Sequence, residues 1–151
     1  MLDLVLAIVH FLLAFSIAAV LAAELALLTP TMTANALRLA GRVDAWYGIL
    51  ALALIVVGFS RAIFTAKGWA YYSANAFFWA KIGAFALVGL LSIVPTVRLI
   101  AWRRAERQRP GTVPDRPAIA GVRRFLWAEA AAFAFIPVFA SLMARGYGVA
   151  G

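Results

Sequence analysis

Residues 4–28 read LVLAIVHFLLAFSIAAVLAAELALL, with His10 and Glu24 as the only ionisable side chains of this run. About 20 apolar residues in a helix cross the roughly 30 Å hydrocarbon core of a bilayer, so the run is long enough to span a membrane. Three further apolar runs follow, at residues 45–64, 76–97 and 125–145. We therefore predict an all-α fold: an integral membrane bundle of four transmembrane helices in up-down order, with residues 1–151 forming a single transmembrane domain.

The composition supports a lipid environment. Apolar residues make up 66% of the chain, against about 45–50% in a soluble domain. A soluble globule of this size would leave much of that surface in water. The chain has no cysteine, which excludes disulfides, iron–sulfur clusters and thiolate zinc sites. It also lacks a Gly-rich phosphate loop, a nucleophile elbow and a zinc motif, so the sequence assigns no catalytic residue.

The connections between the predicted spans differ in character. Residues 31–42 predict a short amphipathic helix at the membrane interface, after which Asp44 caps the second span. Residues 98–124 contain eight arginines and three prolines, which favours a solvated, irregular loop. Aromatic residues near the predicted span ends, Trp46 and Tyr47 among them, indicate an interfacial belt.

Basic residues are distributed unevenly between the two sides of the bundle. Of the 14 basic residues, ten lie in or beside the first and third connections: Arg38, Arg42, Arg98, Arg103, Arg104, Arg107, Arg109, Arg116, Arg123 and Arg124. The positive-inside rule places these connections, including the basic loop 98–124, in the cytoplasm and both termini outside it. We expect a multi-pass protein of the bacterial inner (plasma) membrane. Anionic lipid accounts for the net charge of +8, and nucleic acid is not an expected partner.

Three basic side chains fall within the spans toward the outward side: His10, Arg61 and Lys81. Groups of this charge repel one another unless something anionic joins them. A haem propionate, a porphyrin carboxylate or a lipid phosphate would do so, with His10 able to ligate iron. The alternative is that Arg61 and Lys81 reach out to the headgroups while His10 bonds a carbonyl. A single histidine excludes a bis-histidine haem within one chain, and copper is not favoured because no methionine is grouped with His10.

An inner polar layer contains three acidic residues: Glu24, Asp44 and Glu129. Each lies within about a turn or so of an arginine-rich connection, which predicts that they pair with arginines. The alternative is a part in proton movement.

Several short motifs carry a resemblance to a known family. They are His10-Phe11, Glu24, Asp44-x-x-Tyr47-Gly48, Gly58-x-x-Arg61, Tyr71-Tyr72, Phe78-Trp79-x-Lys81, Ser92-x-x-Pro95-Thr96 and Trp102-Arg103. Through them the whole chain resembles a family of short bacterial predicted membrane proteins of unknown function. More distantly it is similar to the superfamily of HemJ-type protoporphyrinogen oxidase and CopD-like membrane domains. In the HemJ type a histidine early in helix one and a lysine early in helix three belong to the haem-associated site, and His10 and Trp79-x-Lys81 match them. The arginine- and histidine-containing stretch that follows helix one in the HemJ type is absent, because this chain reads Leu28-Thr29-Pro30-Thr31-Met32.

Three functional hypotheses follow. The first is a protein that binds haem b or a porphyrin through His10, Arg61 and Lys81, with a redox role and a redox or membrane-protein partner. The second is a non-catalytic membrane scaffold or interaction module. The third is a small proton-linked transporter in which Glu24 and Glu129 titrate, and which needs a homodimer to build a path because four helices leave little lumen.

Overall fold

The computed structural model describes residues 1–64 and 68–148, so residues 65–67 and 149–151 of the predicted single domain lie outside the described residues. The described residues form helices and no strand: α1 Leu2–Leu27, α2 Ala34–Phe64, α3 Gly68–Ser73, α4 Ala76–Gln108 and α5 Arg116–Ala144. All of these except the short α3 are long and apolar enough to cross a membrane. The predicted all-α fold with four candidate transmembrane helices is confirmed.

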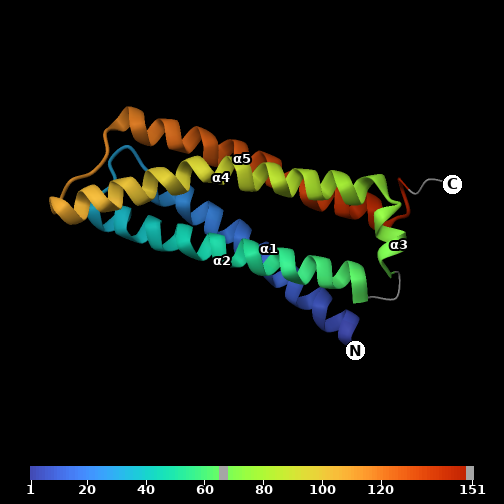
Figure 1. The fold of residues 1–151 in the computed structure, drawn as a ribbon. Helices are drawn as coiled ribbons and strands as arrows, with labels where there is room; N and C mark the ends of the chain where they lie inside the picture. Colours follow the sequence, from blue (N-terminus) through green and yellow to red (C-terminus); the bar gives the residue numbers. More distant parts are fainter. Residues whose placement is uncertain (65–67, 149–151) are drawn as a thin grey trace.

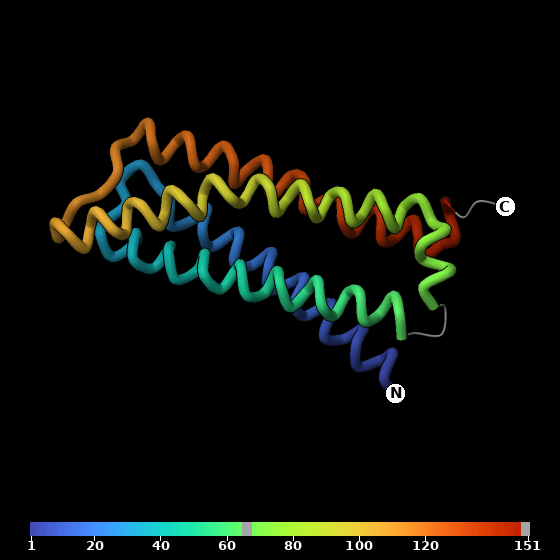
Figure 2. The backbone as a smooth tube through the Cα atoms, in the orientation of Figure 1, coloured from blue at the N-terminus to red at the C-terminus, as the bar shows by residue number. Residues whose placement is uncertain are grey.

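The four long helices form two antiparallel hairpins, α1 with α2 and α4 with α5 (Figure 1). Contacts between α2 and α4 join the hairpins, and α1 also reaches α5. The N-terminus, α3 and the end of α5 lie together at one end of the bundle, which we call the terminal end (Figure 2). The connections at residues 28–33 and 109–115 lie at the opposite end, which we call the arginine-rich end.

Apolar side chains occupy both the interior and the outer surface of the bundle. Ile17, Leu21, Val88 and Leu126 are buried in one core that all four long helices share. Large apolar side chains also point outward, and that of Phe15 is 72% exposed. Leaving this much apolar surface in water would be unfavourable by about 25 cal/mol per Å². The exposed surface is therefore the one that contacts lipid.

The second helix begins earlier than the sequence predicts. The expected interfacial helix over residues 31–42 is instead the first part of α2, which runs unbroken from Ala34 to Phe64. Thr33 caps this helix, because its hydroxyl accepts a hydrogen bond of 3.2 Å from the Ala36 amide. The prediction that Asp44 is a helix cap is wrong, since Asp44 lies inside α2.

The connection between the last two spans is much shorter than predicted. The irregular loop expected over residues 98–124 is wrong for most of its length, because α4 continues to Gln108 and α5 begins at Arg116. Alanine and arginine are strong helix formers, so arginine-rich sequence extends a helix readily. Asp115 caps α5 by accepting a hydrogen bond of 2.9 Å from the Ala118 amide, and Pro117 lies in the first turn, where proline is tolerated.

Asn75 joins two parts of the terminal end. Its buried side chain accepts a hydrogen bond of 2.9 Å from the Phe77 amide and so caps α4. The same side chain donates a hydrogen bond of 3.0 Å to the Tyr147 carbonyl. The adjacent Ala76 amide donates to the Gly148 carbonyl at 2.9 Å. Residues after α5 are thereby held against the start of α4.

Candidate functional site

A cavity of about 270 Å³ lies inside the bundle, in the half nearer the terminal end. His10 of α1 and Lys81 of α4 are the ionisable side chains on its described lining. The rest of the lining is apolar or aromatic: Ala14, Leu54, Ile55, Gly58, Phe59, Phe78, Ile82, Phe85, Ala86, Phe133 and Ile136. The structure therefore brings two of the three predicted outer residues to one apolar space that contains no acidic side chain.

The imidazole of His10 packs against α2 at Gly58. A Cβ atom at Gly58 would lie 3.4 Å from Cε1 of His10 and 3.7 Å from its Nδ1. Nδ1 is buried and has no hydrogen-bond partner among the described residues. This edge of the imidazole is closed to a ligand by α2, so any ligand in the cavity would have to meet His10 through Nε2.

Lys81 is held within the bundle. Its Nζ lies 5.3 Å from the centre of the Phe78 ring, within the range of a cation–π interaction, and both residues line the cavity. Arg61, in the last turn of α2, is not part of that lining. Its charge is still near enough to act on both His10 and Lys81. The three residues are thus neighbours, but Arg61 lies outside the space that the other two share.

The cavity offers the kinds of side chain that bind haem, but its volume is small for a haem. His10 offers one imidazole nitrogen, and Lys81 and Arg61 offer cations for carboxylates. The volume is slightly below the roughly 300–1,000 Å³ of ordinary small-molecule pockets, so the cavity would have to widen to hold a whole macrocycle. Among the described residues, no group of three or more histidine, cysteine, aspartate or glutamate side chains is arranged to hold a metal ion.

A second polar cluster lies nearer the arginine-rich end. It consists of Glu24 from α1, Asp44 and Tyr47 from α2, and Glu129 from α5, and we call it the carboxyl cluster. Glu24 and Glu129 are 2% and 1% exposed, and Tyr47 is also buried. The charges of the three carboxyl groups act on one another, and the Tyr47 hydroxyl faces Glu129 without the geometry of a formed hydrogen bond. The structure therefore unites the predicted inner layer and adds a tyrosine to it.

The carboxyl groups of this cluster differ in their hydrogen bonds. Asp44 accepts a hydrogen bond of 2.7 Å from the Thr96 hydroxyl of α4. In contrast, Oε1 of Glu24 and both carboxyl oxygens of Glu129 are buried without a hydrogen-bond donor among the described residues. A buried polar atom left in this state costs about 1–3 kcal/mol, and more if it is charged. The glutamates are the part of the cluster that the fold leaves unsatisfied.

The prediction that arginines neutralise the inner layer is wrong for Glu24 and Glu129. The nearby arginines bind backbone carbonyls instead. Nη1 of Arg123 donates to the Leu25 and Leu28 carbonyls at 2.5 and 2.8 Å, at the end of α1. Nη1 of Arg103 donates to the Gly41 carbonyl at 3.0 Å, while its charge also acts on Asp44. The Leu25 and Leu28 carbonyls lie at the end of α1, where helix carbonyls have no intrahelical partner and compete with the carboxyl groups for Arg123, whereas Gly41 lies inside α2.

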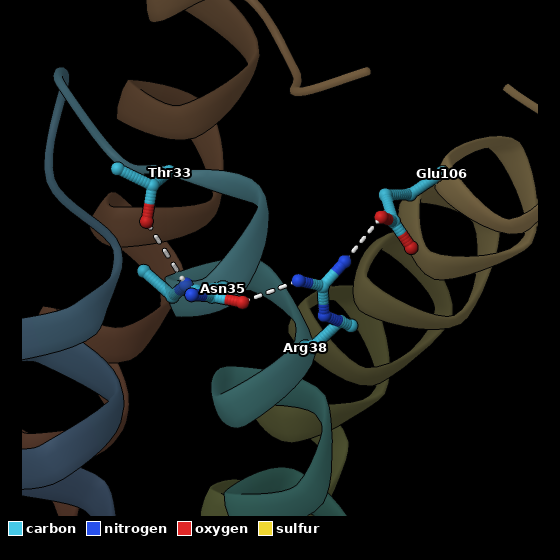
Figure 3. A network of polar contacts seen from close by, with 5 residues as sticks. Thr33, Asn35, Arg38 and Glu106 are labelled. Atoms are coloured by element: carbon cyan, nitrogen blue, oxygen red, sulfur yellow. Dashed lines mark hydrogen bonds and ion pairs between the residues drawn. The ribbon is translucent and has the colours of Figure 1, made fainter. Parts of the chain in front are cut away.

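An ion pair is formed at the arginine-rich end by a residue that the sequence did not single out. Arg38 of α2 contacts Glu106 of α4 at 2.5 Å. Figure 3 shows that Arg38 also binds the side chain of Asn35, next to the Thr33 cap of α2. Glu106 is one helical turn from Arg103 on α4, and that spacing was available in the sequence as a signal.

A polar groove of about 340 Å³ between α2 and α4 leads to the carboxyl cluster. Asp44, Tyr47, Ser92, Thr96 and Arg103 supply its polar lining. The cluster therefore has an access route from the side of the bundle where Arg103 lies.

Tyr47 and Phe85 are site residues that the sequence reasoning missed. Tyr47 was assigned to an interfacial aromatic belt, but it is buried in the core beside Glu129. It lies three residues after Asp44, and that spacing places both on one helix face. Phe85 is partly buried and lines both the cavity at Lys81 and the groove at Asp44. Nothing in the sequence distinguishes it from the other phenylalanines.

The helices and their two polar clusters define a polytopic membrane protein with ionisable groups in its interior. The chain belongs to the family described as "Predicted membrane protein (DUF2214)", which matches residues 2–148. The resemblance to a family of predicted membrane proteins is thereby confirmed. No curated protein and no solved structure matches the chain. The distant similarity to the HemJ-type and CopD-like superfamily stays a prediction.

Proposed function

We propose that this protein binds, within the membrane, an apolar ligand that carries an acidic group. The observation behind this proposal is the cavity whose lining joins His10 and Lys81 to apolar side chains alone. Cationic groups buried at this depth are costly without a counter-charge. A carboxylate or phosphate on the ligand would supply it, and the aromatic lining would hold the apolar body.

Each lining residue has a distinct part in this binding. Lys81 donates a charge-assisted hydrogen bond to the acidic group, and Phe78 keeps the ammonium inside the bundle. His10 contributes Nε2, because Gly58 closes its other edge. Arg61, outside the lining, adds positive potential at His10 and Lys81.

Haem b or a porphyrin is one member of this ligand class, and a fatty acid is another. A porphyrin would place carboxylates on Lys81 and Arg61, and haem would in addition take His10 as an axial ligand. When bound, haem would supply one-electron redox chemistry at its iron. A fatty acid has a narrower body than a macrocycle, so it needs less widening of the cavity.

We propose that the protein lies in a bacterial inner membrane with the arginine-rich end in the cytoplasm. Ten basic residues in or beside the two connections at that end support this orientation. The His10–Lys81 cavity then opens toward the outward half of the bilayer.

The binding proposal is tested with purified protein in lipid nanodiscs. Haemin and protoporphyrin IX are titrated by absorbance, and oleate is titrated by its ability to displace a fluorescent fatty acid. We expect at least one probe to bind, and Lys81→Gln to weaken it about tenfold to a hundredfold, because a charged hydrogen bond contributes about 1.5–3 kcal/mol. Arg145→Gln, which removes an exposed cation beyond the end of α5, is the matched control and leaves affinity unchanged.

The probes also separate the members of the class. His10→Ala alters the haemin spectrum if His10 ligates iron, and it leaves oleate affinity nearly unchanged. If oleate binds but haemin and protoporphyrin IX do not, the haem assignment is wrong and the proposal of an acidic, apolar ligand stands. Equal affinity of wild type and Lys81→Gln for every probe would contradict the proposal.

A further inference from the structure

The carboxyl cluster lies inside the bundle, in the half nearer the arginine-rich end. Glu129 is 13 residues from the start of α5 at Arg116, a rise of about 20 Å along a helix whose total length is about 43 Å. Tyr47 is equally far from the start of α2 at Ala34. Glu24 approaches them from the buried face of α1. Glu24 is only three residues before the end of α1, but Glu24 and Glu129 are 2% and 1% exposed, so water does not solvate either carboxyl group directly.

The unsatisfied oxygens identify the part of the cluster that needs a ligand. Three carboxyl oxygens, on Glu24 and Glu129, are buried with no donor among the described residues. Two ionised glutamates and Asp44 would also repel one another in a medium of low dielectric constant. Removing charge from the cluster is therefore strongly favourable.

The space beside the two glutamates limits which cation can neutralise their charge. Neither Glu24 nor Glu129 lines the cavity at Lys81 or the groove at Asp44, and their burial at 2% and 1% exposure favours the smallest cation. The described acidic side chains are not arranged as metal ligands. A proton needs no cavity and no set of ligands.

Positive groups nearby do not replace the proton. Arg123 faces the end of α1 from α5, but its guanidinium is bonded to the Leu25 and Leu28 carbonyls. Arg103 of α4 is bonded to the Gly41 carbonyl and acts on Asp44. Asp44, which also has the Thr96 hydroxyl, is thus the carboxyl group best able to stay ionised.

We infer that Glu24 and Glu129 form a proton-binding site inside the membrane, reached from the groove through Asp44 and Tyr47. Asp44 takes a proton from water in the groove. That proton passes to the Tyr47 oxygen as Tyr47 releases its own hydroxyl proton to the Glu129 carboxylate. Asp44 and Tyr47 return to their starting states, so the net change is one proton bound at Glu129, which Glu24 shares.

Dicyclohexylcarbodiimide tests this inference, because it is an apolar reagent that adds to a protonated carboxyl group and rearranges to a stable N-acylurea. Full-length protein in nanodiscs is treated over a range of pH, and the labelled residues are found by peptide mass spectrometry. We expect labelling on Glu129 or Glu24, falling about tenfold per pH unit once the site loses its proton. Glu106, which is buried but paired with Arg38, is the internal control and stays unlabelled.

Further measurements distinguish a proton from other occupants and test the route. Sodium ions added at constant pH leave the labelling unchanged; protection by sodium would show a cation site and overturn the inference. Absence of label on both glutamates of the wild-type protein at every pH would also overturn it, and this result does not depend on how well a variant folds. Tyr47→Phe keeps the ring in place and slows the recovery of labelling after a jump from high to low pH. Recovery at the wild-type rate would exclude Tyr47 from the route.

Discussion

The Thr96 hydroxyl donates a hydrogen bond of 2.7 Å to the Asp44 carboxylate, which links α4 to α2 across the polar groove. This link joins the two helical hairpins at a polar point, whereas most of their contact is apolar. It also gives Asp44 a donor that the two glutamates of the carboxyl cluster lack. The same bond therefore contributes both to the packing of the hairpins and to the difference between the carboxyl groups.

Thr96→Val tests the contribution of this bond to stability. Valine keeps the shape of the side chain and removes the donor, so we expect a loss of about 1–3 kcal/mol from leaving the Asp44 oxygen without its partner. Thermal unfolding in detergent measures the loss. Thr96→Ser retains a hydroxyl and serves as the control. A melting midpoint for Thr96→Val equal to that of wild type would show that water replaces the bond at no cost.

The ion pair at the arginine-rich end should respond unequally to the loss of each partner. Arg38 is 48% exposed in its side chain and Glu106 only 6%. We expect Arg38→Gln to cost about 1–3 kcal/mol, because it leaves a buried carboxylate unpaired. Glu106→Gln should cost less than about 1 kcal/mol, because the released arginine returns to water. Unfolding measurements on both variants give the comparison, and equal losses would argue against this asymmetry.

Gly58 should tolerate a methyl group but not a large side chain. A Cβ there meets His10 at an ordinary contact distance, and alanine is more stable than glycine within a helix, so we expect Gly58→Ala to gain about 0.5–1 kcal/mol and keep ligand affinity. Gly58→Leu should push the imidazole aside, costing about 1–3 kcal/mol and the binding of haemin or oleate. Melting and titration of the two variants check both effects. Unimpaired binding by Gly58→Leu would show that His10 has no part in the cavity.

Asn75 should stabilise the terminal end through two separate bonds. Asn75→Ala removes the cap of α4 and the bond to Tyr147, for an expected loss of about 2 kcal/mol. Asn75→Asp keeps the acceptor for the Phe77 amide but loses the donor to the Tyr147 carbonyl, so its loss should fall between alanine and wild type. Hydrogen exchange at the first turn of α4 follows the effect. Identical exchange in alanine and aspartate variants would mean that only one of the bonds matters.

The orientation in the membrane is tested with reporter fusions. Alkaline phosphatase, which is active only outside the cytoplasm, should be active when fused after Gly151 and inactive when inserted in the connection at residues 109–115. A fluorescent protein that matures in the cytoplasm should give the opposite pattern. The expectation rests on the charge asymmetry between the two ends. The reverse pattern would place the His10–Lys81 cavity in the inner half of the bilayer.

The sequence predicted the spans well and their ends poorly, for a physical reason. Long apolar runs have no other stable location than lipid, so the four helices follow from composition. The last turns of α4 and the first turns of α5 are rich in arginine and alanine, which favour helix, but their charge and the nearby prolines were interpreted as signs of a loop. Charge alone did not indicate that these helices continue beyond residue 97 and begin before residue 125.

The sequence predicted how far along the helices the polar clusters lie, but not which groups their side chains bind. Counting residues along a helix placed His10 near Lys81 and Glu24 near Glu129, because the rise per residue is fixed. Whether an arginine binds a carboxyl group depends on whether a nearby backbone carbonyl also needs a hydrogen-bond donor. Arginines of the nearby connections were expected to neutralise the glutamates, yet Arg103 and Arg123 bind backbone carbonyls. Competition of this kind is decided by three-dimensional geometry, which the order of residues does not contain.

The ring of Phe85 is the wall shared by the cavity at His10 and the groove at Asp44. The size of the side chain at position 85 therefore contributes to the separation of the two spaces. Lys81 lies one helical turn before Phe85. We expect it to keep its place when another residue occupies position 85. Relatives with a small residue in place of Phe85 should accept longer ligands with the same acidic group, and relatives with tryptophan should accept shorter ones. We therefore expect ligand length to vary within this family wherever Lys81, which we propose binds the acidic group, is kept.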